Sequence, residues 1–164
     1  MERSKLEKPL ADAVERFVEC HKMEDYLNSV DPYLDIEDKG WSRNYITRIA
    51  LKGTITGEMW VVASEPVVAS SIPIEDVIEY NLELKDWSLE IANQIAGIFV
   101  TTLNQNQCNV EVEIPEPKIV DGMIDFFNDA TPPIVTKVVL PNNHSISVLL
   151  QLNDDATLGE KSCG

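Results

Sequence analysis

Cysteine is scarce in this sequence, and none of the three residues is placed for a disulfide framework or a structural zinc site. Cys20, Cys108 and Cys163 are odd in number, form no C-x-x-C pair and have no histidine at ligand spacing. We therefore expect reduced thiols, and no cofactor or metal of the protein's own.

Long apolar runs are also missing. A transmembrane helix would need about 18 uncharged apolar residues in succession, and no such run occurs. The first residues, MERSKLEKPLADAVERF, carry charges where a signal peptide has an apolar core. We expect a soluble, cytoplasmic protein with no membrane insertion.

Positive charge is the third deficit. Only 13 Lys and Arg residues stand against 28 Asp and Glu residues, which gives a formal net charge of -15. A field of this sign repels phosphate backbones, and no basic patch offsets it, so we expect no nucleic-acid partner. The G-x-S-x-G, P-loop and G-x-G-x-x-G motifs do not occur either.

The length and apolar content fit one domain. With 164 residues, 44% of them hydrophobic, the chain is long enough to bury about 70% of its unfolded surface. We assign residues 1–152 to a single domain. Residues 153–164, NDDATLGEKSCG, are small, polar and aperiodic, which predicts a disordered tail.

Helical periodicity occurs in several segments. Apolar residues recur at helical spacing over residues 9–28, where Pro9 suits the first turn. The same spacing predicts a short helix over 72–84 and a major helix that begins at residue 86. A further short helix or helical turn is predicted over 122–130.

Strand patterns lie between these helices. Residues 46–53 and 55–64 are rich in β-branched and aromatic side chains and predict a hairpin. Residues 108–114 alternate in polarity until Pro115 and Pro117, which we expect to end ladder pairing. Residues 134–140 and 145–152 flank PNNH, whose asparagines tolerate positive φ, and predict a second hairpin. This order predicts an α+β domain with helices on one face of a largely antiparallel sheet.

A polar stripe runs along the apolar segment DWSLEIANQIAG, residues 86–97. At about 100° per residue, Asp86, Glu90, Asn93 and Gly97 fall within about 60° of the helix circumference. Apolar residues occupy about 200° of the remainder and would anchor the helix on a sheet. A rigid helix fixes outward side chains better than a loop, so the stripe is a candidate site.

Structural interpretations of the same residues stay open. Glu followed three residues later by Asn arises often by chance, and an amphipathic helix has a polar face in any case. Asp86 is suited to cap the helix, and Gly97 would permit close packing of a neighbouring element.

The histidines and tryptophans are weaker candidates. His21 and His144 stand alone and are interpreted as surface or helix-packing residues. Trp41 and Trp60 are interpreted as core or rim residues, and Trp87 is a candidate flank of the site because it follows Asp86.

The run from Asp86 to Gly97 resembles the signature helix of the CheC/CheX/FliY phosphatases of bacterial chemotaxis. That signature is Asp or Ser, three residues, Glu, two residues and Asn, with Gly soon after, and Asp86, Glu90, Asn93 and Gly97 match it in turn. It occurs once here, as in the CheX branch, because ADAVERFVEC in the first helix lacks Glu-x-x-Asn. A looser resemblance over residues 5–152 implies a CheC-like architecture.

The family pattern also has a proline downstream of the helix. Pro115 and Pro117 bracket the expected position without occupying it.

The resemblance implies dephosphorylation of the aspartyl phosphate of a CheY-type response-regulator receiver. Asn93 would hold a water in line with the phosphorus, because a carboxamide donates and accepts without adding negative charge. Glu90 would pair with a receiver lysine and fix the docking. Asp86, Trp87 and Gly97 would contribute to binding, and Mg²⁺ is expected in the partner receiver.

Two alternatives belong to other functional classes. One is a non-catalytic adaptor that docks on a receiver. The other is a dimeric interaction module, since the CheX branch forms dimers through its sheets and the strand IVTKVVL, residues 134–140, offers an edge. A homodimer is expected in either case.

Overall fold

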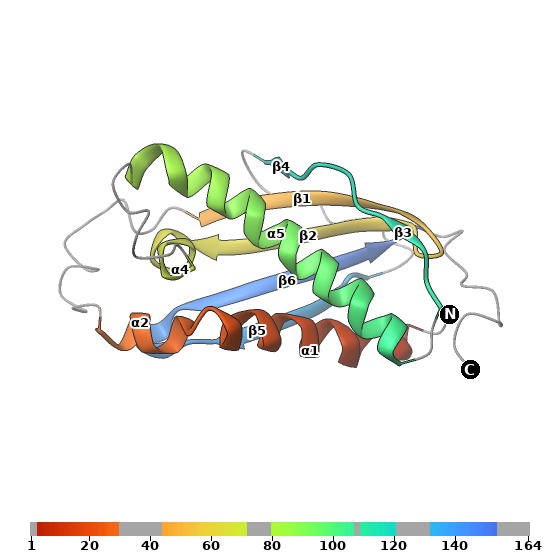
Figure 1. The fold of residues 1–164 in the computed structure, drawn as a ribbon, viewed down its shortest axis with the longest axis horizontal. Helices are drawn as coiled ribbons and strands as arrows, with labels where there is room; N and C mark the ends of the chain where they lie inside the picture. The colour runs from red at the N-terminus through yellow and green to blue at the C-terminus, as the bar shows by residue number, and fades with distance from the viewer. Residues whose placement is uncertain (1–2, 30–43, 72–79, 107–108, 121–131, 154–164) are drawn as a thin grey trace.

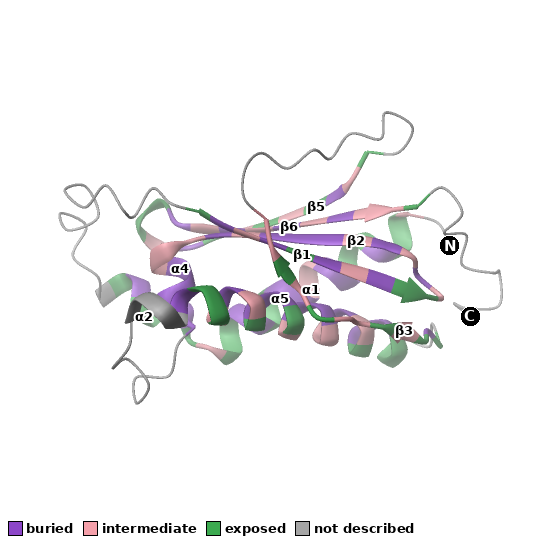
Figure 2. Cartoon of the chain, turned by 90° about the horizontal axis from the view of Figure 1, so that it is seen from above, coloured by how far each residue is buried: buried purple, intermediate pink, exposed green. Residues whose placement is uncertain are grey.

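The chain folds into two layers, one of strands and one of helices (Figure 1). The computed structural model describes residues 3–29, 44–71, 80–106, 109–120 and 132–153. Seen from above, the helices cover one face of the sheet, and buried residues lie where the layers meet (Figure 2). All strand pairs in the described part are antiparallel. The predicted α+β class is confirmed.

The sheet is built from the two predicted hairpins. β1 (Asn44–Gly53) pairs with β2 (Gly57–Ser64), and β5 (Ile134–Val139) pairs with β6 (Ser145–Leu152). β2 and β6 lie side by side, so the hairpins join into one sheet with β1 and β5 on opposite sides.

The turn of the second hairpin uses two asparagines in the left-handed region. Asn142 has φ 60° and Asn143 has φ 62° within a 3-10 turn over Pro141–Asn143. The Asn142 side-chain amide also donates to the Leu27 carbonyl at 2.8 Å, which ties the turn to the helical layer. The prediction of positive φ at these residues is confirmed.

Two short strands pair along the outer side of β1. β3 (Val112–Glu113) is a short segment of the strand predicted over 108–114, of which the structure describes residues 109–114. After Pro115 and Pro117, β4 (Lys118–Ile119) pairs with β1 again. The expectation that the two prolines end strand pairing was wrong. Each proline lacks only its own backbone N–H donor, and the residues that follow can pair again.

The N-terminal helical segment consists of two helices, and the single helix predicted over 9–28 was wrong. α1 (Ser4–Cys20) begins upstream of the prediction, and α2 (Met23–Ser29) follows a break at His21 and Lys22. Lys22 has φ 50°, the left-handed conformation in which helices commonly end.

Pro9 lies inside α1 and not in its first turn, contrary to the prediction. A proline in a helix removes one backbone hydrogen bond and disfavours the turn before it. Leu6 is 1% exposed, and Pro9 and Leu10 are buried in the same helix. We attribute the upstream extension to this burial, because apolar contact offsets the missing hydrogen bond.

Two further helices complete the described layer. α4 (Glu65–Ser70) was not predicted; Pro66, at the start of this helix, is compatible with its first turn. α5 (Tyr80–Gln105) contains the major helix predicted from residue 86. No helix in the described part combines the length and apolar character that a bilayer span requires.

Several predictions fall outside the described residues. These are the larger part of the helix over 72–84, the short helix over 122–130 and residues 154–164 of the tail. The division into a domain over 1–152 and a tail therefore stays a prediction.

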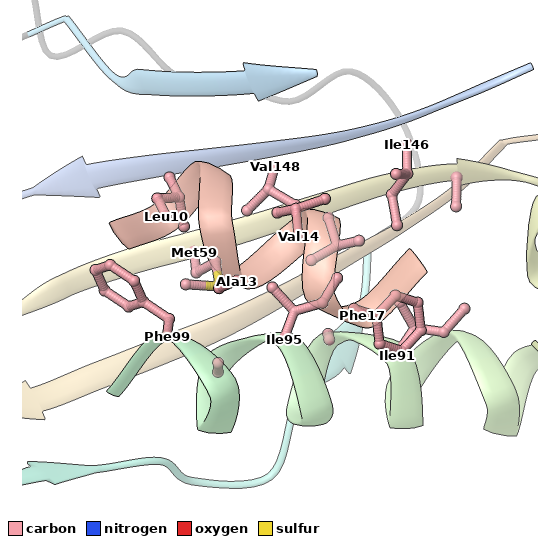
Figure 3. Packing of buried hydrophobic residues seen from close by; sticks show 14 of the residues in the cluster. Leu10, Ala13, Val14, Phe17, Met59, Ile91, Ile95, Phe99, Ile146 and Val148 are labelled. Atoms are coloured by element: carbon pink, nitrogen blue, oxygen red, sulfur yellow. The ribbon is translucent and has the colours of Figure 1, made fainter. Parts of the chain in front are cut away.

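The hydrophobic core lies between α5, α1 and the sheet (Figure 3). Ile91, Ile95 and Phe99 of α5 point into it, and each is at most 1% exposed. The side chains that complete this region come from α1 and the strands: Leu10, Val14, Phe17, Met59, Ile146 and Val148. One full face of α5 is thereby fixed.

Ile95→Ala tests how strongly this face anchors the helix. We expect it to lower the free energy of unfolding by about 2–4 kcal/mol, since it removes buried methyl groups and leaves a cavity. Thr101→Ala, at an exposed position of the same helix, is the control and should change stability by less than about 0.5 kcal/mol. Urea denaturation measures both, and an equal effect of the two variants would contradict the anchoring role.

Candidate functional site

The polar stripe of α5 faces away from the core, as predicted. Asp86, Glu90 and Asn93 are exposed, and Gly97 is half-buried on the same side. Because the opposite face of α5 is buried between α1 and the sheet, this orientation is fixed by packing. Asp86 lies inside α5, which begins at Tyr80, so the interpretation of Asp86 as an N-cap was wrong.

A polar contact also fixes α5 on β1 of the sheet. The Thr47 hydroxyl of β1 donates to the Ser88 backbone carbonyl of α5 at 3.3 Å. Both residues are buried, at 1% and 3% exposure, so the bond lies in the contact between the layers. Ser88 is two residues before Glu90, so this contact places the stripe beside β1.

The chain between β3 and β4 carries an extra residue. Five residue steps separate Glu113 from Lys118, but only four separate their partners Lys52 and Arg48. Such a bulge at a sheet edge bends the strand locally and redirects its side chains. Pro115 and Pro117 suit this segment, because residues in a bulge do not pair with the neighbouring strand and so do not need the backbone N–H that proline lacks.

The bulged segment and α5 enclose a groove of about 270 Å³. One wall belongs to α5 and the other to the segment between the two short strands. The lining residues are Asp86, Leu89, Glu90, Asn93, Ile114, Pro115, Glu116 and Pro117. The groove therefore brings the predicted acid and amide against a stiff, proline-rich wall.

The groove is acidic. Asp86, Glu90 and Glu116 contribute carboxylates, and none of the lining residues is basic. A site of this charge attracts an ammonium or guanidinium group and repels an unscreened phosphate. Asn93 is the one side-chain amide among the lining residues.

Glu90 and Asn93 differ in their hydrogen bonds. The Gln94 side-chain amide donates to Glu90 Oε1 at 2.9 Å, and His21 Nε2 lies 2.9 Å from Gln94 Oε1. Within the described part of the chain, no side chain engages the Asn93 carboxamide. Asn93 thus presents both donor and acceptor to the groove.

The sequence did not single out Gln94 or Glu116. Gln94 is four residues after Glu90, a spacing at which helical side chains meet, so this neighbour was detectable. Glu116 comes from a segment whose position depends on the strand register, which no local pattern reveals.

Trp87 and Gly97 do not line the groove. Trp87 packs against the hydrophobic core. A Cβ added at Gly97 would meet nothing within 4 Å, so in the described structure no neighbouring element packs closely there. The interpretation of Gly97 as a packing glycine finds no support.

The other candidates are placed as structural residues. His21 follows α1, where its ring contacts Phe17, and His144 is buried after the hairpin turn. Trp60 is 7% exposed on β2, and Trp41 lies outside the described residues. Among the described residues, no three His, Cys, Asp or Glu side chains gather so as to hold a metal ion.

Several solved structures share this architecture. The chemotaxis protein CheX from Desulfovibrio desulfuricans matches with a TM-score of 0.60 and 15% identity, over 91% of this chain and 99% of that one. A chain of the CheX–CheY–BeF3–Mg²⁺ complex from Borrelia burgdorferi matches with a TM-score of 0.57 and 20% identity, over 90% and 97%. No protein-family model and no curated protein matches the sequence. The chain thus has the fold of CheX chemotaxis proteins, as the resemblance of residues 86–97 implies.

Gly97→Ala tests whether another element packs closely on Gly97 or whether the surface at this residue is open. Since the added Cβ meets nothing within 4 Å, we expect the free energy of unfolding to rise by about 0.5–1 kcal/mol, the helix-propensity difference. Thermal or urea unfolding measures it. A loss of stability would contradict the open surface at Gly97.

Proposed function

We propose that this protein is a phosphatase that accelerates hydrolysis of the aspartyl phosphate of a CheY-type response-regulator receiver. The observation that carries the proposal is the placement of Glu90 and Asn93. They lie one helical turn apart and are exposed on α5, whose opposite face is buried. The signature match of residues 86–97 and the CheX fold support it, as does the CheX–CheY complex solved with that fold.

Asn93 acts on the attacking water. Its carboxamide accepts a hydrogen bond from the water and holds the water oxygen in line with the phosphorus. The water oxygen bonds to phosphorus as the aspartyl oxygen–phosphorus bond breaks, which releases phosphate and a free receiver carboxylate. An amide serves here because it neither attacks phosphorus itself nor adds charge beside the phosphoryl oxygens.

Glu90 acts in docking. Its carboxylate pairs with a lysine of the receiver, and a charge-assisted hydrogen bond of this kind fixes orientation as well as adding affinity. A carboxylate that faced the phosphoryl group would be repelled by its negative charge, so Glu90 contacts the lysine instead. The one-turn spacing then sets Asn93 at a fixed distance from the docked lysine.

The acidity of the groove supports a metal that is held by the receiver. Asp86, Glu90 and Glu116 would repel a bare phosphate, so the phosphoryl group must arrive already neutralised. We therefore place Mg²⁺ in the acidic pocket of the receiver. Asp86 then contributes to binding from the groove wall, Trp87 supports the helix from behind, and Gly97 leaves room for the partner surface.

We also propose a homodimer that pairs through β5. In the described part of the sheet, β5 has one neighbour, β6, and its other side is an edge. Three large apolar side chains are exposed among the described residues, and two of them, Val135 at 58% and Val139 at 72%, lie on this strand. An edge strand of this composition favours pairing with a second copy.

Two variants separate docking from catalysis. Asn93→Ala should reduce the acceleration of receiver dephosphorylation by roughly 100-fold and leave receiver affinity near native, because it removes only the orientation of the water. Glu90→Ala should weaken both affinity and acceleration. The lifetime of the phosphorylated receiver and its dissociation constant from each variant measure the two effects.

Gln105→Ala is the control, since Gln105 is an exposed amide at the far end of the same helix. It should behave like the native protein. Native protein that leaves the receiver's lifetime unchanged contradicts the phosphatase proposal, and phosphorylation-dependent binding without acceleration would favour the adaptor alternative.

Val139→Lys tests the dimer. A charge at the exposed edge should weaken self-association about tenfold or more, because pairing would bury it or bring like charges together. Val139→Thr keeps the β-branched shape and is the matched control. Sedimentation velocity over a concentration series measures both, and a native protein that stays monomeric rules the dimer out.

A further inference from the structure

A chain of hydrogen bonds leads from α1 to the proposed docking residue. His21 Nε2 lies 2.9 Å from Gln94 Oε1, and Gln94 Nε2 donates to Glu90 Oε1 at 2.9 Å. Residues 21 and 94 are far apart in the sequence, so this link depends on the packing of α1 against α5.

The chain fixes which end of the Gln94 amide faces Glu90. A carboxylate only accepts hydrogen bonds, so Gln94 must turn its NH2 group toward Glu90 and its oxygen toward His21. The oxygen in turn needs a donor, which His21 Nε2 supplies when it carries a proton. If the amide were reversed, its oxygen would face the carboxylate and both would be acceptors.

His21 is itself held in place. It follows the last turn of α1, where its backbone N–H donates to the Phe17 carbonyl at 3.2 Å. Its ring lies against the Phe17 ring, with 4.5 Å between the ring centroids. Phe17 is 1% exposed and belongs to the core, so the imidazole is aimed at Gln94 by buried structure.

Glu90 keeps most of its capacity for a partner. A carboxylate has about four lone-pair directions, and the Gln94 amide uses one of them. Glu90 also lines the groove, where its other lone pairs are available to a docked cation. The contact with Gln94 therefore restricts the side chain without blocking it.

We propose that His21 and Gln94 are positioning residues that hold the Glu90 carboxylate in its docking orientation before the receiver arrives. The inference rests on the proposed docking role of Glu90 and adds two residues that are not among the four signature positions. Its physical basis is preorganisation: a long acidic side chain that is already ordered loses less conformational entropy on binding. The effect belongs to receiver affinity and not to the reaction step, which Asn93 governs.

Gln94→Met tests the link, because methionine has a similar shape and makes neither hydrogen bond. We expect the receiver concentration at half-maximal rate to rise roughly three- to tenfold, the range for one freed side chain. The rate at saturation should change by less than about twofold, since only ground-state docking is altered. In a Glu90→Ala background the same substitution should have no further effect, because the group it positions is gone.

His21 provides a conservative rescue. His21→Gln keeps an N–H donor of similar reach and should retain near-native affinity, whereas His21→Leu removes the donor and should resemble Gln94→Met. Gln105→Met, at an exposed glutamine of the same helix, is the matched control and should leave the affinity unchanged. If Gln94→Met has native affinity while Glu90→Ala weakens binding, the positioning role is overturned and the docking role stands.

A readout that needs no receiver separates this inference from the proposed function. Nitrogen-15 NMR of the histidine ring should show His21 Nε2 protonated in the native protein, with its resonance shifted in Gln94→Met. An unprotonated Nε2 in the native protein overturns the link, whatever the phosphatase assay shows. A protonated, shifted Nε2 together with no receiver binding would support the link and reject the phosphatase.

Discussion

The buried face of α5 is the constraint on which the site depends. Ile91, Ile95 and Phe99 are held between α1 and the sheet, and the close packing of a core leaves the helix little freedom to rotate. With about 3.6 residues per turn, that one fixed face determines where every other side chain points. Glu90 and Asn93 face outward because the buried residues beside them fix the rotation of the helix about its axis.

A helix alone presents a surface, and the sheet edge turns that surface into a groove. The extra residue between Glu113 and Lys118 moves Pro115 and Pro117 out of the ladder, and their restricted φ keeps the segment stiff. The two prolines therefore stiffen the second wall. The sequence marked these prolines as the end of a strand and as neighbours of the expected family proline, but not as a wall of the groove, which both of them line.

Local patterns predicted the parts of this fold that local forces determine. The periodicity of residues 86–97 predicted the helix and its outward stripe, and PNNH predicted a turn with positive φ. The start of α1 was wrong because Leu6 is buried by distant elements, which outweighs the helix-breaking tendency of Pro9. The groove and the His21–Gln94 contact escaped prediction because each joins segments far apart in the sequence: the groove depends on the register of the strands, and the contact depends on the packing of α1 against α5.

The charge of the groove bears on specificity. Three carboxylates and one amide make a poor pocket for a small phosphate ester, because nothing in the lining offsets its charge. Under the proposed function, selectivity would come from a substrate that brings its own cations, with the acidic groups contacting those cations and the neutral Asn93 near phosphorus. The proposed function thus separates recognition from catalysis by one turn of α5, and it requires a docked protein surface, more than a deep pocket, to define the substrate.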